Sequence, residues 1–126
     1  MPVQFHYLEQ GIVHVRWMGK VTIEELDSVI VPVREKIDET GDAHYVEIVD
    51  LSECTQIPFD LRGLWRVGTF DARILGYVIL KPTTLAKTMA SMLTKVGGIS
   101  FRHAESIEEA ISACKTLIND HMTKKT

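Results

Sequence analysis

The sequence has 126 residues, of which 45% are hydrophobic and 25% are charged, and its formal net charge is −3. This length and composition are typical of a soluble globular protein with one core, so we treat residues 1–126 as a single domain. The acidic balance and the scattered basic residues argue against a nucleic-acid partner, because nucleic-acid binders usually carry a basic stripe.

The sequence also argues against a membrane-spanning protein and against a secreted one. The longest apolar run, Ile74–Leu80, is too short to span a bilayer, and the N-terminal residues lack the pattern of a signal peptide. Cys54 and Cys114 stand far apart and match no disulfide, metal or redox spacing, and the histidines show no ligand spacing either. We therefore expect a cytoplasmic protein with no metal and no cofactor.

The first residues predict a β-hairpin. Val3–Leu8 and Ile12–Met18 are strand-like runs, and Gly11 in the loop between them suits a positive φ. In the second run apolar residues alternate with His14 and Arg16. One face of this strand is therefore expected to be buried and the other exposed to solvent, as near a sheet edge.

A helix follows and extends to about Glu39. Thr22 and Glu25 form a capping box at its start, and Gly41 suits its end. Pro32 predicts a kink or a break inside it. Apolar residues recur at spacings of three and four along its inner face: Ile23, Leu26, Ile30, Val33 and Ile37.

The segment Tyr45–Leu64 is the one around which the chain is organised. Tyr45–Leu51 predicts a central strand that ends at Asp50 and Ser52, a polar loop Ser52–Ile57 follows, and Pro58 suits the first turn of a short helix. In α/β proteins a strand that leads into a helix in this way usually builds a working edge at the carboxyl ends of the strands.

Two more strand–helix units complete the chain. Ile74–Leu80 predicts a parallel strand covered on both faces, and Thr83 or Thr84 is expected to cap the next helix, which ends at Gly97–Gly98. The inner stripe of that helix is predicted to be Leu85, Met89, Met92, Leu93 and Val96.

Ile99–Arg102 predicts a short last strand, and Ser106–Glu109 is a second capping box. The helix that it opens turns these residues inward: Ile107, Ala110, Ile111, Cys114, Leu117 and Ile118. The element order ββαβαβαβα predicts a single-domain α/β fold, a mixed sheet with helices packed on it.

Four segments in this order carry a family resemblance: the hairpin, Gly19–Glu25, Val49–Ser52 and Ala104–Ile111. Together they resemble the SpoIIAA-like branch of the STAS domains, the anti-sigma-factor-antagonist fold, over nearly the whole chain. The resemblance implies a small non-enzymatic domain that acts through protein contacts, with a kinase-like or anti-sigma-type regulator as its partner, or that binds a small or lipid-like ligand as some relatives do.

One motif departs from the family. In anti-sigma antagonists the strand-to-helix loop carries an Asp-Ser pair before a Gly-Leu, and the partner kinase phosphorylates that serine. Gly63-Leu64 is present here, but Pro58, Phe59 and Asp60 stand where the pair belongs. The phosphorylation switch is therefore not carried over.

Two sets of residues are candidates for binding at the predicted edge, and we expect no catalytic residue. The partner-binding set is Ser52, Phe59, Asp60, Arg62 and Trp65, because Trp and Arg are enriched at interface hot spots. The anion-binding set is Lys81, Thr83, Thr84 and Arg102. The alternatives are that Leu61, Leu64 and Trp65 pack on the sheet, that Asp50 and Ser52 only satisfy turn backbone, and that Thr83 or Thr84 only caps a helix.

Two functions follow from these patterns. The first is a non-catalytic regulatory or protein-interaction domain that forms a homodimer, with the exposed hairpin edge as the contact. The alternative is a carrier for a small apolar or lipid-like ligand, in a pocket between the helix after Pro58 and the helix after Thr83. In that alternative Lys81 or Arg102 would take an anionic head group.

Overall fold

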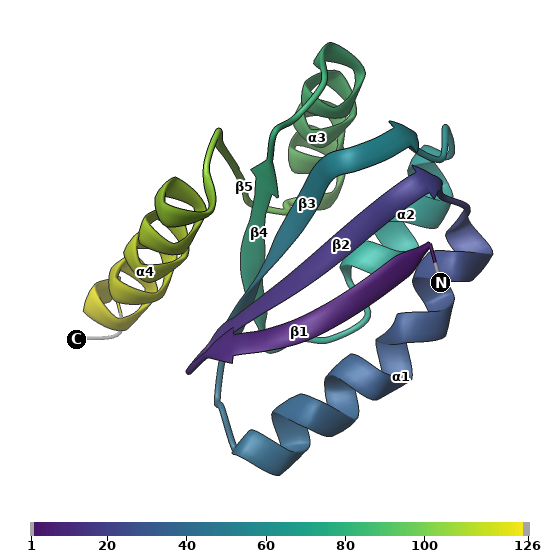
Figure 1. The fold of residues 1–126 in the computed structure, drawn as a ribbon. Helices are drawn as coiled ribbons and strands as arrows, with labels where there is room; N and C mark the ends of the chain where they lie inside the picture. Colours follow the sequence, from purple (N-terminus) through teal and green to yellow (C-terminus); the bar gives the residue numbers. More distant parts are fainter. Residues whose placement is uncertain (1, 125–126) are drawn as a thin grey trace.

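The sheet is mixed, and its strands follow one another in sequence order (Figure 1). The computed structural model describes residues 2–124, which form five strands and four helices in the order ββαβαβαβα. The first two strands are antiparallel, and the last three run parallel to the second. The predicted architecture is confirmed. The strands are β1 (Val3–Glu9), β2 (Ile12–Lys20), β3 (Tyr45–Gln56), β4 (Ile74–Leu80) and β5 (Phe101–Ala104).

The helices cover the two faces of the sheet unequally (Figure 1). Three helices lie on one face and only α4 lies on the other, where Ala110, Cys114 and Leu117 pack against Ile48 and Val78. No helix within residues 2–124 is long and apolar enough to cross a membrane. The helices are α1 (Ile23–Thr40), α2 (Leu61–Gly68), α3 (Thr84–Gly97) and α4 (Ile107–Lys124).

The local signals at turns and helix ends are largely confirmed. Gly11 has a φ of 77° in the hairpin turn, and Thr22 and Glu25 exchange both hydrogen bonds of the capping box. Gly41 and Gly98 are the C-caps of α1 and α3. At α4 the backbone N–H of Glu109 donates to Ser106, as in the predicted capping box, but the Glu109 carboxylate accepts from the N–H of Glu105 and not from that of Ser106. Each of these features depends on residues that are close in sequence.

β3 is longer than predicted. The expected end at Asp50–Ser52 is wrong, because the strand continues to Gln56 beside β2. The register shifts between the pairs Arg16–Asp50 and Met18–Glu53, which marks a bulge. Asp50 Oδ1 accepts a hydrogen bond from the Ser52 N–H at 2.9 Å and another from the Ser52 hydroxyl. The Asp-Ser pattern therefore stabilises a bulge within the strand, and residues 52–56 are not a loop.

Two helix predictions also need correction. α2 begins at Leu61, with Asp60 as its N-cap, so Pro58 lies before the helix and not in its first turn. α1 runs unbroken through Pro32. Proline removes the hydrogen bond to the carbonyl four residues earlier, and both Pro32 and Ser28 face solvent, where water can replace that bond.

The inner face of α3 and the position of the last strand were also predicted wrongly. α3 buries Ala86, Met89, Ala90 and Leu93, whereas three residues of the predicted stripe are exposed. The stripe that faces the sheet has the same helical spacing as the predicted one and includes two small alanines. β5 begins at Phe101 because the Ile99 carbonyl accepts a hydrogen bond from Thr94 in α3. The exposed residues are Leu85, Met92 and Val96.

Candidate functional site

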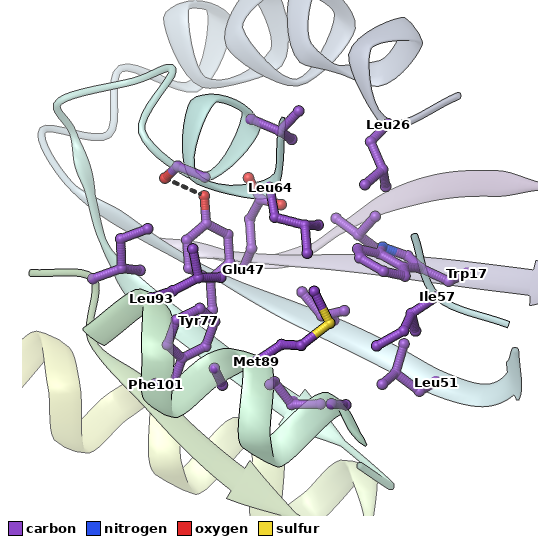
Figure 2. Close-up of a pocket in the computed structure, with 18 of the residues that line it drawn as sticks. Trp17, Leu26, Glu47, Leu51, Ile57, Leu64, Tyr77, Met89, Leu93 and Phe101 are labelled. Carbon is purple, nitrogen blue, oxygen red and sulfur yellow. Dashed lines mark hydrogen bonds between the residues drawn. The ribbon is translucent and has the colours of Figure 1, made fainter. Parts of the chain in front are cut away.

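A cavity of about 110 Å³ lies between the sheet and helices α1, α2 and α3 (Figure 2). Strands β2 to β5 form one wall, and the three helices form the other. Almost every lining side chain is apolar. The residues that contribute most visibly are Trp17, Leu26, Leu51, Ile57, Leu64, Met89, Leu93 and Phe101.

The sequence leaves this space because the helices that cover it are short or carry small side chains. α2 has eight residues, of which Leu64 and Val67 reach the cavity. α3 turns Ala86 and Ala90 toward the sheet, where larger side chains would fill the gap. Leu85 of the same helix is exposed instead. The space between the sheet and helices α1, α2 and α3 is therefore less completely filled than the space between the sheet and α4.

Glu47 places a carboxyl group inside this apolar cavity. It lies on β3, and because side chains alternate along a strand it shares a face with Val49 and Leu51, which also line the cavity. The residue is only 7% exposed, and Oε2 has no hydrogen-bond partner. Burial, together with the nearby negative charge of Asp71, raises the pKa of Glu47 to about 8. At neutral pH this carboxyl is therefore mainly protonated.

Tyr77 is the neighbour of Glu47 across the β3–β4 pair. Its hydroxyl donates a hydrogen bond to the Gly68 carbonyl at 2.7 Å, which fastens the end of α2 to the sheet (Figure 2). Burial, with a further contribution from Glu47, raises the pKa of Tyr77 well above its usual value. The cavity wall is thus neutral at pH 7 even at its polar positions.

The seam between α2 and α3 closes over the cavity. The Trp65 indole on α2 lies so close to Gly97 on α3 that any side chain at position 97 would collide with it. Leu64, next to Trp65 in sequence, and Leu93, one helical turn before Gly97, line the cavity below. This contact makes Trp65 part of the roof, although the residue is 44% exposed.

The partner-binding set predicted from sequence falls into two places. Phe59, Asp60, Arg62 and Trp65 lie together at the start of α2, where Phe59 is 80% exposed and Asp60 accepts a hydrogen bond from Gly63. Ser52 lies apart from them, because its partner Asp50 is bonded to His14 on the sheet face opposite the cavity.

The anion-binding set is divided in a similar way. Thr83 is the N-cap of α3, and the exposed Lys81 and Thr84 stand beside it. Arg102 follows the cavity-lining Phe101 on β5, so strand alternation turns it to the opposite face. A second cavity of about 140 Å³ adjoins the first and is lined in part by Thr83 and Cys54.

Sequence reasoning missed Glu47, the most distinctive residue of the cavity. Its only signal in the sequence is a charged residue in the middle of the apolar part of the strand Tyr45–Leu51. Alternation along the strand would have placed it on the same face as Val49 and Leu51. Burial on both sides of β3 then implies a buried carboxyl.

Comparison with known proteins identifies the fold. A scan against protein-family models and a search of curated proteins each found no match. Among solved structures, an uncharacterised protein of the DUF3478 family with a SpoIIAA-like fold, from Shewanella loihica PV-4, matches with a TM-score of 0.63 and 13% identity. The match covers 89% of this chain and 91% of that chain.

Two structures of SpoIIAA match as well. The unphosphorylated anti-sigma factor antagonist SpoIIAA has a TM-score of 0.56 and 14% identity, over 90% of this chain and 97% of that chain. The phosphorylated Bacillus cell fate determinant SpoIIAA has a TM-score of 0.57 and 18% identity, over 88% and 97%. The chain therefore has the SpoIIAA-like fold, as its sequence pattern predicted. At these identities the likeness concerns the fold alone.

Proposed function

We propose that this chain is a non-catalytic binding domain that holds a small apolar molecule between its sheet and helices α1 to α3. The observation that carries this proposal is the cavity of about 110 Å³ with its apolar wall. An apolar cavity of ~150 Å³ in another protein stays dry and accepts a guest of about benzene's size. A guest here would restore the dispersion contacts that an empty space lacks.

Native mass spectrometry of the protein purified from its own host tests this function. We expect a bound mass that organic extraction removes. Ala90→Leu, which fills the cavity from α3, should abolish it. Ser91→Leu is the matched control, because Ser91 is the exposed neighbour of the buried Ala90. Circular dichroism confirms that both variants fold.

Two results together would contradict the proposal. One is a wild-type protein that carries no bound mass. The other is a melting temperature that does not rise when benzene is added, since a ligand that binds only the folded state must stabilise it.

Protein interaction is the second candidate function, and an exposed apolar segment favours it. Phe59, Leu61 and Trp65 are 80%, 39% and 44% exposed at the start of α2. Large exposed apolar side chains that stand together often mark an interaction site. SpoIIAA, which shares the fold, is an anti-sigma factor antagonist. A kinase-like or anti-sigma-type regulator is therefore the partner that we propose for this surface.

Affinity purification from the host separates this function from ligand binding. Such a regulator should be retained by the wild type and lost with Phe59→Ser or Trp65→Ala. Met122→Ser is the control, because Met122 is an exposed apolar residue on α4, on the opposite face of the sheet. Retention of the same proteins by all four chains would contradict a partner site here.

Self-association through the hairpin edge is part of the same proposal. β1 pairs only with β2 in the described sheet, so its outer edge is open to a second strand. Sedimentation velocity should then show a dimer whose fraction rises with protein concentration. A monomer across the whole concentration range would contradict it.

A further inference from the structure

The carboxyl of Glu47 is a buried polar group that the fold itself does not use. Its Oε2 has no hydrogen-bond partner, and none of the ion pairs found within residues 2–124 includes it. A buried polar atom without a partner destabilises a protein, and a leucine in its place would pack without that cost. Glu47 lines a cavity large enough for a small molecule, and because Oε2 itself is covered, a ligand reaches this oxygen only when the carboxyl group turns about its terminal bond.

We propose that Glu47 recognises a hydroxyl group on an otherwise apolar ligand, so that the guest of this cavity is a small neutral alcohol or phenol. This inference rests on the proposed function, because it requires a molecule inside the cavity. It differs from the anionic head group near Lys81 or Arg102 that the sequence suggested.

Charge is the first reason for a neutral ligand. Among the described residues that line the cavity there is no Lys, Arg or His to balance an anion, so an anion would lose its hydration without a compensating charge. A cationic ligand would have to lose its own hydration and also force Glu47 to ionise in an apolar wall. A hydroxyl avoids both costs.

Hydrogen bonding is the second reason. Because burial raises the pKa of Glu47 to about 8, its carboxyl carries a proton at pH 7. A protonated carboxyl has one donor and further acceptor capacity, and a hydroxyl has one donor and two lone pairs. One hydroxyl can therefore donate a hydrogen bond to the carboxyl group of Glu47 and also accept one from it.

The volume limits the apolar part of the ligand. At about 110 Å³ the cavity is somewhat smaller than the ~150 Å³ that accommodates benzene elsewhere. A short chain or one ring is therefore the upper limit of size, and a ring with a substituent requires a small movement of the walls. A longer chain would require α2 and α3 to separate at the contact between Trp65 and Gly97.

A set of one-ring probes tests the role of Glu47 directly. Ethylbenzene, benzyl alcohol and benzylamine have nearly the same shape and differ in one group: a methyl, a hydroxyl or an ammonium. Benzoate adds the anion. Each is titrated into the full-length chain at pH 7, and the affinity ratio of benzyl alcohol to ethylbenzene is compared among the wild type, Glu47→Gln and Glu47→Leu.

We expect Glu47→Leu to lower that ratio by about tenfold, the worth of one or two net hydrogen bonds. Comparing this ratio between proteins cancels the different hydration of the two probes, because each probe has the same hydration in every titration. Glu47→Gln should retain most of the ratio, because an amide also has a donor and an acceptor. If Glu47→Leu does not fold, the wild type still tests the inference, because it must bind benzyl alcohol more tightly than benzylamine and benzoate.

The outcomes separate this inference from the proposed function. Equal ratios in the three proteins, with ethylbenzene bound by all of them, would overturn the role of Glu47 and leave the ligand-binding function standing. Tighter binding of benzylamine or benzoate than of benzyl alcohol by the wild type would overturn the neutral ligand. Failure of every probe to bind would overturn the ligand-binding function and this inference together.

Discussion

Two carboxyl groups on β3 show how differently the two faces of the sheet treat the same chemical group. Glu47 and Asp50 are three residues apart and almost equally buried, at 7% and 8% exposed. Glu47 faces the cavity and has an oxygen without a partner. Asp50 lies on the opposite face, where it accepts hydrogen bonds from Ser52 and shares one with His14.

The pKa values move in opposite directions as a result. Burial raises the pKa of Glu47 to about 8. For Asp50 burial acts in the same sense, but the hydrogen bonds from Ser52 and His14 outweigh it and lower the pKa. Burial alone therefore does not mark a carboxyl as functional. The missing partner does, because it leaves a polar group available to a ligand.

The largest expected effect is the pH dependence that Glu47 gives to stability. Its folded pKa lies above its unfolded value of 4.5, so the folded state binds more protons between pH 4.5 and about 8. The free energy of unfolding must therefore fall as pH rises through that window. The accumulated loss is on the order of 5 kcal/mol, because each unit of pKa difference is worth ~1.4 kcal/mol.

Urea unfolding of the wild type and Glu47→Leu from pH 4 to 9 measures this effect. The variant lacks the group, so its stability advantage should grow from pH 4.5 to about 8 and then stay constant. A difference between the two proteins that does not change with pH would show that Glu47 has a partner in solution.

Asp50→Ala is expected to have the next largest effect and the opposite pH dependence. It removes the acceptor that serves Ser52 and His14, so the variant should be less stable by about 2 kcal/mol at pH 7. Because the folded pKa of Asp50 is lowered, its contribution is present above the unfolded value and is lost as pH falls through the folded pKa. The measurement is the same urea series, extended to pH 2. If Asp50→Ala is still less stable than the wild type at the lowest pH, the stabilisation does not depend on the charge of Asp50.

Ser52→Ala tests the bulge by itself, with an expected loss of about 1.5 kcal/mol at pH 7 for one hydrogen bond to a charged acceptor. The Ser52 N–H bond to Asp50 remains in this variant. The pKa of Asp50, followed by NMR, should rise toward its usual value. An unchanged pKa would show that the hydroxyl does not contribute.

How much of this could be predicted from the sequence depended on how local each signal was. The capping residues Thr22 and Glu25 and the glycine at position 41 act within one turn of α1, and all were predicted correctly. The extension of β3 depends on pairing with β2, as at Met18 and Glu53, more than thirty residues apart. No pattern within residues 52–56 reports that pairing.

The cavity could not be predicted in detail for a similar reason. Apolar residues surround much of α3, so the 3.6-residue period fits the observed stripe of Ala86, Met89 and Leu93 as well as the predicted one. Only the packing of α3 against α2 and the sheet decides which stripe turns inward. The pocket between these two helices was proposed from sequence, but its single carboxyl was not.

The smallest expected effect, and the most direct test of the comparison, is that of Glu47→Gln at low pH. An amide matches a protonated carboxyl in shape and in having a donor and an acceptor, so at pH 4.5 the variant should lie within about 1 kcal/mol of the wild type. Above pH 8 it should be the more stable of the two, since it cannot ionise. Glutamine at position 50, in Asp50→Gln, serves as the control, because it replaces a partnered carboxylate and should destabilise the protein at neutral pH. If Glu47→Gln is instead strongly destabilised at pH 4.5, then Glu47 has a partner that holds it as a carboxylate even at that pH. In that case the two faces of β3 do not differ in whether their carboxyl groups have partners.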